Sequence, residues 1–465
     1  MTAGVRGKRS IAIGTTLLAV IGSLSLAPQL TAAAVAAPPN YTGDPTQYWN
    51  GALQEMFRRA TGTAGSPGAL ARSAAMMNAA VFDAESSYQA TFGTAKYKAY
   101  LAAPKYWNLG QGADEEERVI GRTAYNILHD LYPAQTAYLD GKFQERFGTK
   151  PTDYDVIDTQ IVGTIVTNMR QARSADGADN PALYVPDNVP GAWRPTDPAG
   201  TSESKCATGA DAVTPEWGKV KPFALTSGAQ FRPTTPGTYS SYASLLASPA
   251  YAAQVDQVRR LGAANSTERT TDQTAAAWFW ANDLNGTYKP PGQLLSATAS
   301  IAAQRNLSKY ESTRLFALVS LAMADAAIGE WDVKYQTPID LWRPESAIRD
   351  GGLDATWQPL SADRAGHHFS PCFPAWASGH SAFAGAWAGI LQKFFGTDTL
   401  TFTVTTEDPH SPVTSRTFTS FSQAAQEDAN SRLWLGVHYA WDASDGLKLG
   451  RDIATYVYAN KLTAN

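Results

Sequence analysis

The chain has 465 residues, of which 44% are hydrophobic and 17% charged, and its formal net charge is −4. This length exceeds one ordinary domain and is ample for a large buried core. The slightly acidic balance argues against a general nucleic-acid-binding protein, so a site for a polyanion must be a local concentration of positive charge. We expect no nucleic-acid partner, and the sequence defines no oligomeric state.

The first 36 residues have the pattern of a secretory signal peptide. Three basic residues precede an apolar run over 11–30, and an Ala-rich stretch at 32–37 offers a small-residue cleavage site. A membrane anchor is the alternative interpretation. We predict a signal peptide over 1–36, a secreted (extracellular) catalytic domain over 37–465, and no membrane contact after cleavage.

The chain has only two cysteines, Cys206 and Cys372. Export would permit a disulfide between them, but two separate thiols fit the sequence almost as well, because spacing along the chain does not give their distance in space. Two cysteines do not make a disulfide scaffold, and no Cys/His spacing suggests a zinc site.

The first half of the chain reads as helices followed by a long irregular segment. Residues 38–50 are polar and Pro-rich, which predicts a loose segment. Apolar residues at helical spacing then predict helices over 70–88, 115–132 and 155–176. Residues 177–240 are dense in Pro, Gly, Thr and Asp, which predicts long loops that either cover a site or are inert.

The second half is again helical. Ser378 caps a helix that runs to Gly396, and alternation over 400–420 predicts a small hairpin. Further helices are expected at about 241–262, 269–284, 293–306, 309–334, 421–434 and 438–460. We predict an all-α protein of two four-helix-bundle-like halves with long loops, the first over about 50–262 and the second, with the site, over about 266–462.

His438 and Asp442 stand four positions apart, which on a helix places them on one face. Asp442 would then accept a hydrogen bond from Nδ1 of His438 and leave Nε2 for a ligand or substrate. Taken alone, the pair also fits an ordinary surface contact. Arg432 lies six positions earlier, roughly 120° away on an unbroken helix, and Gly436 is where the helix could break so that both side chains converge.

A second set of residues could surround an anion. Ser378, Gly379 and His380 open a helix, where the glycine admits close approach, the helix start favours an anion, and the histidine can act as acid or base. Lys334 and Arg343 add fixed cations to the donor fork of Arg432. Each residue singly also fits a structural role, such as a helix cap, a core histidine or a surface cation. The whole set predicts a buried site for a tetrahedral oxyanion of phosphate or vanadate type.

The motifs that carry these residues resemble those of the vanadium-dependent haloperoxidases and their relatives, the type 2 phosphatidic-acid phosphatases and bacterial acid phosphatases. They read KYQTPIDLWRP (334–344), ASGH (377–380) and SRLWLGVHYAWD (431–442). Trp331, Phe373 and the stretch FWANDLNGTYKPPGQ (279–293), which contains Asp283, resemble the haloperoxidase branch. Two departures are that Lys334 lies nine positions before Arg343, two more than the usual phosphatase spacing, and that Ala377 replaces a proline.

The resemblance implies roles for individual residues. His438 would coordinate vanadium, Asp442 would orient His438, and His380 would be the acid–base residue. Vanadate oxygens would be bound by Lys334, Arg343, Ser378, Gly379 and Arg432. Trp331 and Phe373 would line the halide pocket, and Asp283 would buttress an active-site arginine.

The implied reaction is oxidation of a halide by hydrogen peroxide to a hypohalous-acid equivalent, which halogenates a small organic substrate. Vanadate would be the cofactor, acting as a Lewis acid, and phosphate or sulfate could occupy the same site. Lys334 would also be catalytic, by polarising the peroxide. The alternative is a secreted acid phosphatase of the same superfamily, in which His438 is the nucleophile and His380 protonates the leaving group. A third reading is an exported binding protein with an idle site.

Overall fold

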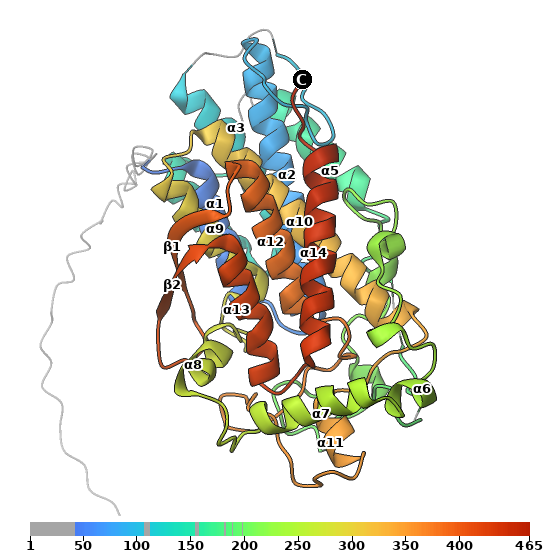
Figure 1. Cartoon of the computed structure of the whole chain (residues 1–465). Helices are drawn as coiled ribbons and strands as arrows, with labels where there is room; N and C mark the ends of the chain where they lie inside the picture. The colour runs from blue at the N-terminus through green and yellow to red at the C-terminus, as the bar shows by residue number, and fades with distance from the viewer. Residues whose placement is uncertain (1–41, 107–111, 154–157, 181–182, 188, 198) are drawn as a thin grey trace, which may run out of the picture. The chain divides into compact units, whose positions relative to one another are not determined.

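The computed structural model describes residues 42–465 apart from 107–111, 154–157, 181–182, 188 and 198. The predicted signal peptide, residues 1–36, lies outside the described residues. The described part of the chain is built from fourteen α-helices and one two-stranded hairpin, with short 3-10 turns and one π-helical turn between them (Figure 1). The prediction of an all-α protein with a small hairpin is therefore confirmed.

The helices before the long irregular segment are α1 (Pro45–Arg59), α2 (Pro67–Thr91), α3 (Ala113–Leu131), α4 (Thr136–Phe147) and α5 (Gly163–Arg173). Those after it are α6 (Tyr242–Leu246), α7 (Pro249–Leu261), α8 (Thr271–Phe279), α9 (Lys289–Gln304), α10 (Lys309–Gln336), α11 (Pro344–Arg349), α12 (Gly379–Phe395), α13 (Phe421–Trp434) and α14 (Ala440–Asn460). The hairpin pairs β1 (Thr399–Thr405) with β2 (Ser415–Ser420) in antiparallel register.

Helix α1 corrects the prediction of a loose segment over 38–50 from Pro45 onward, whereas residues 38–41 lie outside the described residues. The Asp44 side chain accepts hydrogen bonds from the amides of Thr46 and Gln47 at 2.7 and 3.1 Å, so it caps the helix. Pro45 occupies the first helical position, where its missing N–H costs nothing. The proline that suggested a loop is thus part of a helix start.

Two other predicted elements differ in extent. The helix expected over 241–262 is divided into α6 and α7, because Ser248 caps a new helix that begins at Pro249. The helix expected over 269–284 ends at Phe279. In the described part of residues 177–240, the regular structure consists of short 3-10 turns, so the prediction of long irregular loops holds.

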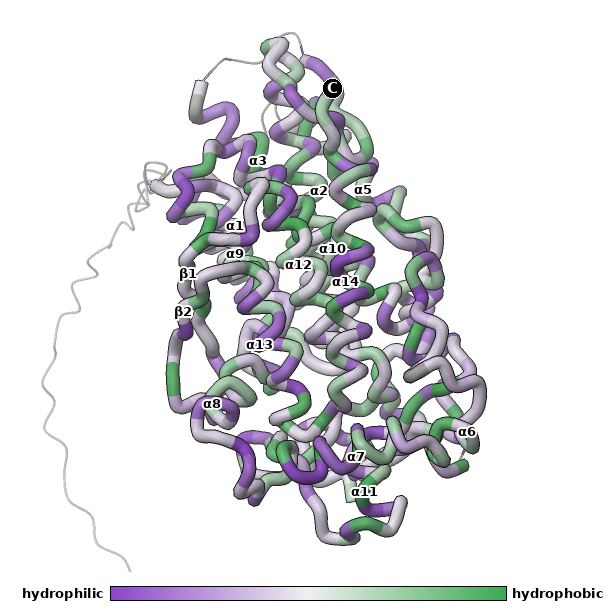
Figure 2. Tube along the Cα trace, viewed as in Figure 1, coloured by the Kyte–Doolittle hydropathy of each residue, from purple (hydrophilic) through white to green (hydrophobic). Residues whose placement is uncertain are grey.

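Helix α10 lies at the centre of the fold. It packs against α2 on one side and against α12 and α14 on the other (Figure 1). It is long and apolar enough to cross a membrane, yet its apolar stretch is entirely buried within the protein, so its neighbours account for its composition. One contiguous apolar core extends from Trp49 to Leu462. In Figure 2, hydrophilic segments are prominent along α7, which is partly exposed.

Helices α12 and α14 pack closely because glycines face the contact. A Cβ at Gly385 would lie 2.5 Å from the carbonyl oxygen of Leu447, and one at Gly450 would lie 2.2 Å from that of Ala382. The close packing brings the starts of both helices together, and the amide of Ser378 donates to the carbonyl of Asp442 at 3.0 Å. The N-terminal ends of α12 and α14 are therefore neighbours.

A disulfide joins Cys206 to Cys372, with their Cα atoms 5.2 Å apart. Of the two possibilities that the sequence left open, a disulfide or two separate thiols, the structure has the disulfide. The bond joins the long irregular segment to the stretch that leads into α12, and Trp193 is buried in one apolar cluster with both cysteines.

Candidate active site

The predicted site residues converge from five parts of the chain. Lys334 is in the last turn of α10, Arg343 immediately precedes α11, Ser378 caps α12, Arg432 is in the last turn of α13, and His438 lies in the loop before α14. Arg432 and His438 line a narrow cavity together with Asp283, Trp331, Phe373, Gly379, His380, Pro67, Pro290, Pro371 and Phe383. Lys334, Arg343 and Ser378 are not among the described residues that line it.

His438 is held at both ring nitrogens. Its Nδ1 lies 3.0 Å from Asp442 Oδ2, and its Nε2 lies 3.1 Å from Arg343 Nη1. Helix α13 ends at Trp434 and Gly436 has a φ of +82°, so the chain turns between Arg432 and His438. The contact with Asp442 is made at the start of α14 rather than along a helix face, because His438 precedes the helix and Asp442 also accepts from the amide of Tyr439 at 3.1 Å.

The histidine is neutral in this environment. Burial, and then the charges of Arg343 and Lys334, hold the pKa of His438 well below its usual value. The neutral ring donates from Nδ1 to Asp442, so Nε2 carries the lone pair. Burial raises the pKa of Asp442 to about 7, against the opposing effects of the Tyr439 amide and Lys334. Nε2 of His438 is therefore the nucleophilic or ligating atom, and its lone pair accepts a hydrogen bond from Arg343 Nη1 that a ligand would have to displace.

The two arginines carry buried N–H groups that lack partners among the described residues. Arg343 donates from Nε to the carbonyl of Phe373 at 2.7 Å and from Nη1 to that of Val437 at 2.8 Å, but Nη2 is buried without a partner. Arg432 donates from Nη2 to Asp283 at 2.9 Å, whereas its Nε and Nη1 are buried and unpaired. Each such group costs about 1–3 kcal/mol when left unsatisfied. An oxyanion bound here would satisfy them, so the residues present fit vanadate or phosphate.

Lys334 faces protein oxygens. Its Nζ lies 2.7, 3.2 and 2.5 Å from the carbonyl oxygens of Pro374, Ala375 and Ala377, and 2.9 Å from Oε1 of Glu330. Burial lowers the pKa of Lys334 to about 8, although Glu330 opposes the shift. The role expected for Lys334, contact with the oxyanion, stays a prediction.

Glu330 is a site residue that the sequence analysis missed. It is fully buried, one helical turn before Lys334, and its carboxylate packs against Gly379. The available signal was a Glu–Lys pair at i and i+4 within an otherwise apolar helix.

His380 is a neutral base next to the cavity. Its Nε2 donates to the carbonyl of Ala281 at 3.1 Å and lies 3.8 Å from Asp283 Oδ1. Burial, and then the charge of Arg432, lowers the pKa of His380 to about 4. Burial alone would raise the pKa of Asp283, but Arg432 and His380 bring it below its usual value. Asp283 thus contacts Arg432 directly and lies beside His380.

Aromatic rings and the start of α12 complete the site. The rings of Trp331 and Phe373 lie 5.1 Å apart, and the Phe373 ring is 4.6 Å from Arg343 Cζ and 4.9 Å from Lys334 Nζ. The Ser378 hydroxyl accepts from the Ser381 amide at 3.5 Å, which leaves its proton available for donation. The apolar rings of Trp331 and Phe373 and the donor residues Gly379 and Arg432 all line the cavity.

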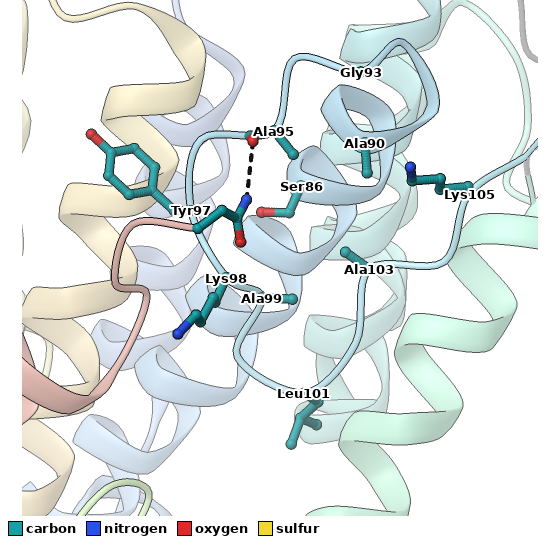
Figure 3. Close-up of a pocket in the computed structure, with 11 residues that line it drawn as sticks. Ser86, Ala90, Gly93, Ala95, Tyr97, Lys98, Ala99, Leu101, Ala103 and Lys105 are labelled. Atoms are coloured by element: carbon teal, nitrogen blue, oxygen red, sulfur yellow. Dashed lines mark hydrogen bonds between the residues drawn. The ribbon is translucent and has the colours of Figure 1, made fainter.

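A larger cleft of about 630 Å³ adjoins this cavity and shares Asp283 and Phe373 with it. Another hollow is formed by the end of α2, the segment 93–105 and Asn465, whose side chain bonds to the carbonyl of Ala95 at 3.0 Å (Figure 3). None of the predicted site residues is among the described residues that line that hollow. The described part of the chain also holds no group of three or more His, Cys, Asp or Glu side chains suited to a bare metal ion.

Two buried arginines, each with N–H groups that lack partners among the described residues, lie around a neutral histidine in this helical fold. This arrangement is typical of an enzyme site that binds an oxyanion. Residues 314–464 match the family described as the VCPO second helical-bundle domain. The chain is 30% identical over 235 aligned positions to the vanadium chloroperoxidase of Curvularia inaequalis, a match that covers 39% of this chain and 38% of that protein.

Two solved structures share the fold over most of the chain. A structure described as the first bacterial vanadium-dependent iodoperoxidase matches with a TM-score of 0.68 and 23% identity, covering 92% of this chain and 99% of that one. A bacterial vanadium-dependent chloroperoxidase in its holo form matches with a TM-score of 0.66 and 16% identity, covering 87% and 95%. The chain is therefore similar to the vanadium haloperoxidases in residues 314–464 and shares their fold over most of its length.

Proposed function

We propose that this chain is a secreted vanadium-dependent haloperoxidase that oxidises a halide with hydrogen peroxide and halogenates a small organic substrate. The observation that carries the proposal is the set of unpaired, buried N–H groups of Arg343 and Arg432 around the neutral ring of His438. The match of residues 314–464 to the haloperoxidase domain supports it. The basic and apolar N-terminal pattern supports secretion.

The cofactor would be held by one histidine and a shell of donors. His438 Nε2 would bind vanadium, while N–H groups of Arg343 and Arg432, the Ser378 hydroxyl and the Gly379 amide would bind vanadate oxygens. When bound, vanadate supplies a Lewis acid that activates hydrogen peroxide toward the halide. The donors are placed in advance by the fold, so little reorganisation is needed when negative charge develops.

His380 would be the acid–base residue of the reaction. Its Nε2 proton is directed to the Ala281 carbonyl, so the other ring nitrogen can accept a proton. The neutral form dominates near neutral pH because the pKa of His380 is lowered to about 4. An oxyanion beside the ring would offset the positive charge of Arg432 and make proton acceptance easier.

Trp331 and Phe373 limit access of water to the cavity. Trp331 is fully buried, its indole N–H is bonded to the carbonyl of Val213 at 2.9 Å, and its ring packs against Phe373. Where water is excluded, the effective dielectric constant is lower, so the electrostatic interactions of the arginines with an anion are stronger. The adjoining cleft, which also contains Phe373, is the place through which a halide and an organic substrate would approach.

The test is a halide-oxidation assay with purified protein, orthovanadate, hydrogen peroxide and a phenolic halogen trap, run in turn with chloride, bromide and iodide. Hydrolysis of p-nitrophenyl phosphate is measured in parallel. We expect halogenation that requires both vanadate and peroxide and that is absent in His438→Ala. Phosphate release without halogenation would assign the site to the acid phosphatases instead.

A further inference from the structure

Glu330 is a buried carboxylate at the site that the proposed reaction does not use. Its side chain is fully buried, and Oε1 lies 2.9 Å from Lys334 Nζ. No other described residue donates a hydrogen bond to either carboxylate oxygen. A buried carboxylate ordinarily accepts several hydrogen bonds. Burial raises the pKa of Glu330 to about 7, and Lys334, the one described partner of the carboxylate, opposes this shift and favours the ionised form.

The carboxylate also lies at the start of α12. A Cβ placed on Gly379 would be 3.0 Å from Oε2 and 3.1 Å from Oε1 of Glu330. The glycine is thus needed to make room for the acid as well as for a ligand. Because the same helix start supplies donors to an oxyanion, the negative charge of Glu330 stands close to where the oxyanion would bind.

The pairing changes what Lys334 can do. An ammonium group has three N–H donors, and Nζ of Lys334 has four protein oxygens within 3.2 Å. Lys334 could reach an oxyanion only by giving up one of these contacts. Glu330 thereby offsets the charge of Lys334, as Asp283 offsets that of Arg432, and leaves Arg343 as the one of the three cations without an ion pair to a carboxylate among the described residues.

Resting on the function proposed above, we propose that Glu330 is an internal counter-anion of the oxyanion site. It keeps Lys334 paired within the protein, lowers the affinity of the site for oxyanions, and favours oxyanions of lower negative charge. The physical reason is repulsion between like charges in a poorly screened interior, which discriminates against the more highly charged ligand. Glu330 is a positioning and specificity-determining residue that touches Lys334 and Gly379.

The experiment measures dissociation constants of inorganic phosphate and orthovanadate by calorimetry for the wild type and Glu330→Gln, Lys334→Met and the double variant. Glu330→Gln keeps the side-chain shape and removes the charge, so binding should tighten by about tenfold. Lys334→Met leaves the acid unpaired and should weaken binding, and adding Glu330→Gln should restore most of the loss. Thermal melts confirm that each variant is folded.

The matched control is Asp332→Asn, on the same helix. Asp332 accepts from Arg232 Nη2 at 2.7 Å and does not line the cavity. The Asp332→Asn variant should bind phosphate with the same dissociation constant as the wild type. At about pH 7.5, where Glu330 is mainly ionised because burial raises its pKa only to about 7, Glu330→Gln should gain more affinity for sulfate, a dianion, than for perchlorate, a tetrahedral monoanion.

The outcomes separate the two proposals. If the wild type binds vanadate but Glu330→Gln neither tightens binding nor rescues Lys334→Met, the role of Glu330 is overturned and the proposed function stands. If the wild type binds neither phosphate nor vanadate, the proposed function fails, and the role of Glu330 fails with it.

Discussion

Asp442 Oδ2 lies 3.0 Å from His438 Nδ1, whereas Oδ1 of the same carboxylate is buried without a partner in the described part of the chain. One oxygen therefore fixes the imidazole, and it does so at the start of α14, where it also accepts from the Tyr439 amide. This contact and the hydrogen bond that Arg343 Nη1 donates to Nε2 together fix the tautomer of His438 and the position of its Nε2.

Replacing Asp442 by Asn should weaken vanadate binding by about 10–100-fold, the range seen when a partner of a metal-bound histidine is removed. The amide can still accept from Nδ1, but the lost negative charge makes Nε2 less basic. Equilibrium dialysis with vanadium analysis measures the change. Asp445→Asn is the matched control, because Asp445 lies on the same helix and bonds to Trp376 Nε1 at 2.8 Å instead. Equal affinities for Asp442→Asn and wild type would show that the carboxylate does not tune His438.

Removing His438 and removing His380 should impair different steps, vanadate binding in the first case and turnover in the second. His438→Ala should abolish vanadate retention, because the variant lacks the one imidazole nitrogen proposed as ligand. His380→Ala should retain vanadate but lose turnover by about 10²–10⁴-fold, the usual contribution of a general acid or base. Vanadium content after dialysis and peroxide-dependent halogenation are measured on the same samples. Tight vanadate retention by His438→Ala would reject the ligand assignment.

Much of this site could be expected from the sequence because its residues sit at helix ends with strong local signals. Ser378 before a glycine and an apolar helical run predicts the start of α12, and Gly436 predicts a break between Arg432 and His438. These signals depend on a few neighbouring residues, so one sequence is enough to read them. The identity of the oxyanion came instead from the resemblance of the motifs to a known family.

Other features depend on tertiary contacts that local patterns do not contain. Lys334 reads as a free cation in the sequence, but the carbonyls that surround it belong to residues 374–377, some forty positions later. Glu330 reads as an ordinary polar residue of α10, and only the packing of α10 against α12 places it beside Gly379. The start of α1 was missed for a different reason, since Pro45 after Asp44 marks a helix start as readily as a turn.

Acid should destabilise the protein through its neutral histidines. The pKa of His380 is about 4 in the folded protein, below its ordinary value near 6.5, so the unfolded chain binds more protons between these two values. The free energy of unfolding should therefore fall as the pH drops from about 6.5 to 4, by roughly 3 kcal/mol for this group. His438 acts in the same direction, because its pKa is also lowered.

Urea unfolding of wild type and His380→Gln across this pH range measures the effect. The variant should show a shallower dependence of stability on pH, with part of it remaining because of His438. Saturating phosphate should also flatten the wild-type curve, since a bound anion favours the protonated imidazole. Parallel curves for wild type and variant would show that His380 is not the group responsible.

The Cys206–Cys372 disulfide should support the site as well as overall stability. Cys372 directly precedes Phe373, whose carbonyl accepts from Arg343, and the amide of Val213 donates to the carbonyl of Cys372 at 2.9 Å. Val213 in turn accepts the indole proton of Trp331.

The double variant Cys206→Ala/Cys372→Ala should lose about 2–4 kcal/mol of stability and should bind vanadate less tightly. Thermal melts and vanadium dialysis measure the two effects. A variant that is less stable but binds vanadate with wild-type affinity would confine the disulfide to the stability of the irregular segment, because the positions of Phe373 and Arg343 would then be fixed by the helices alone.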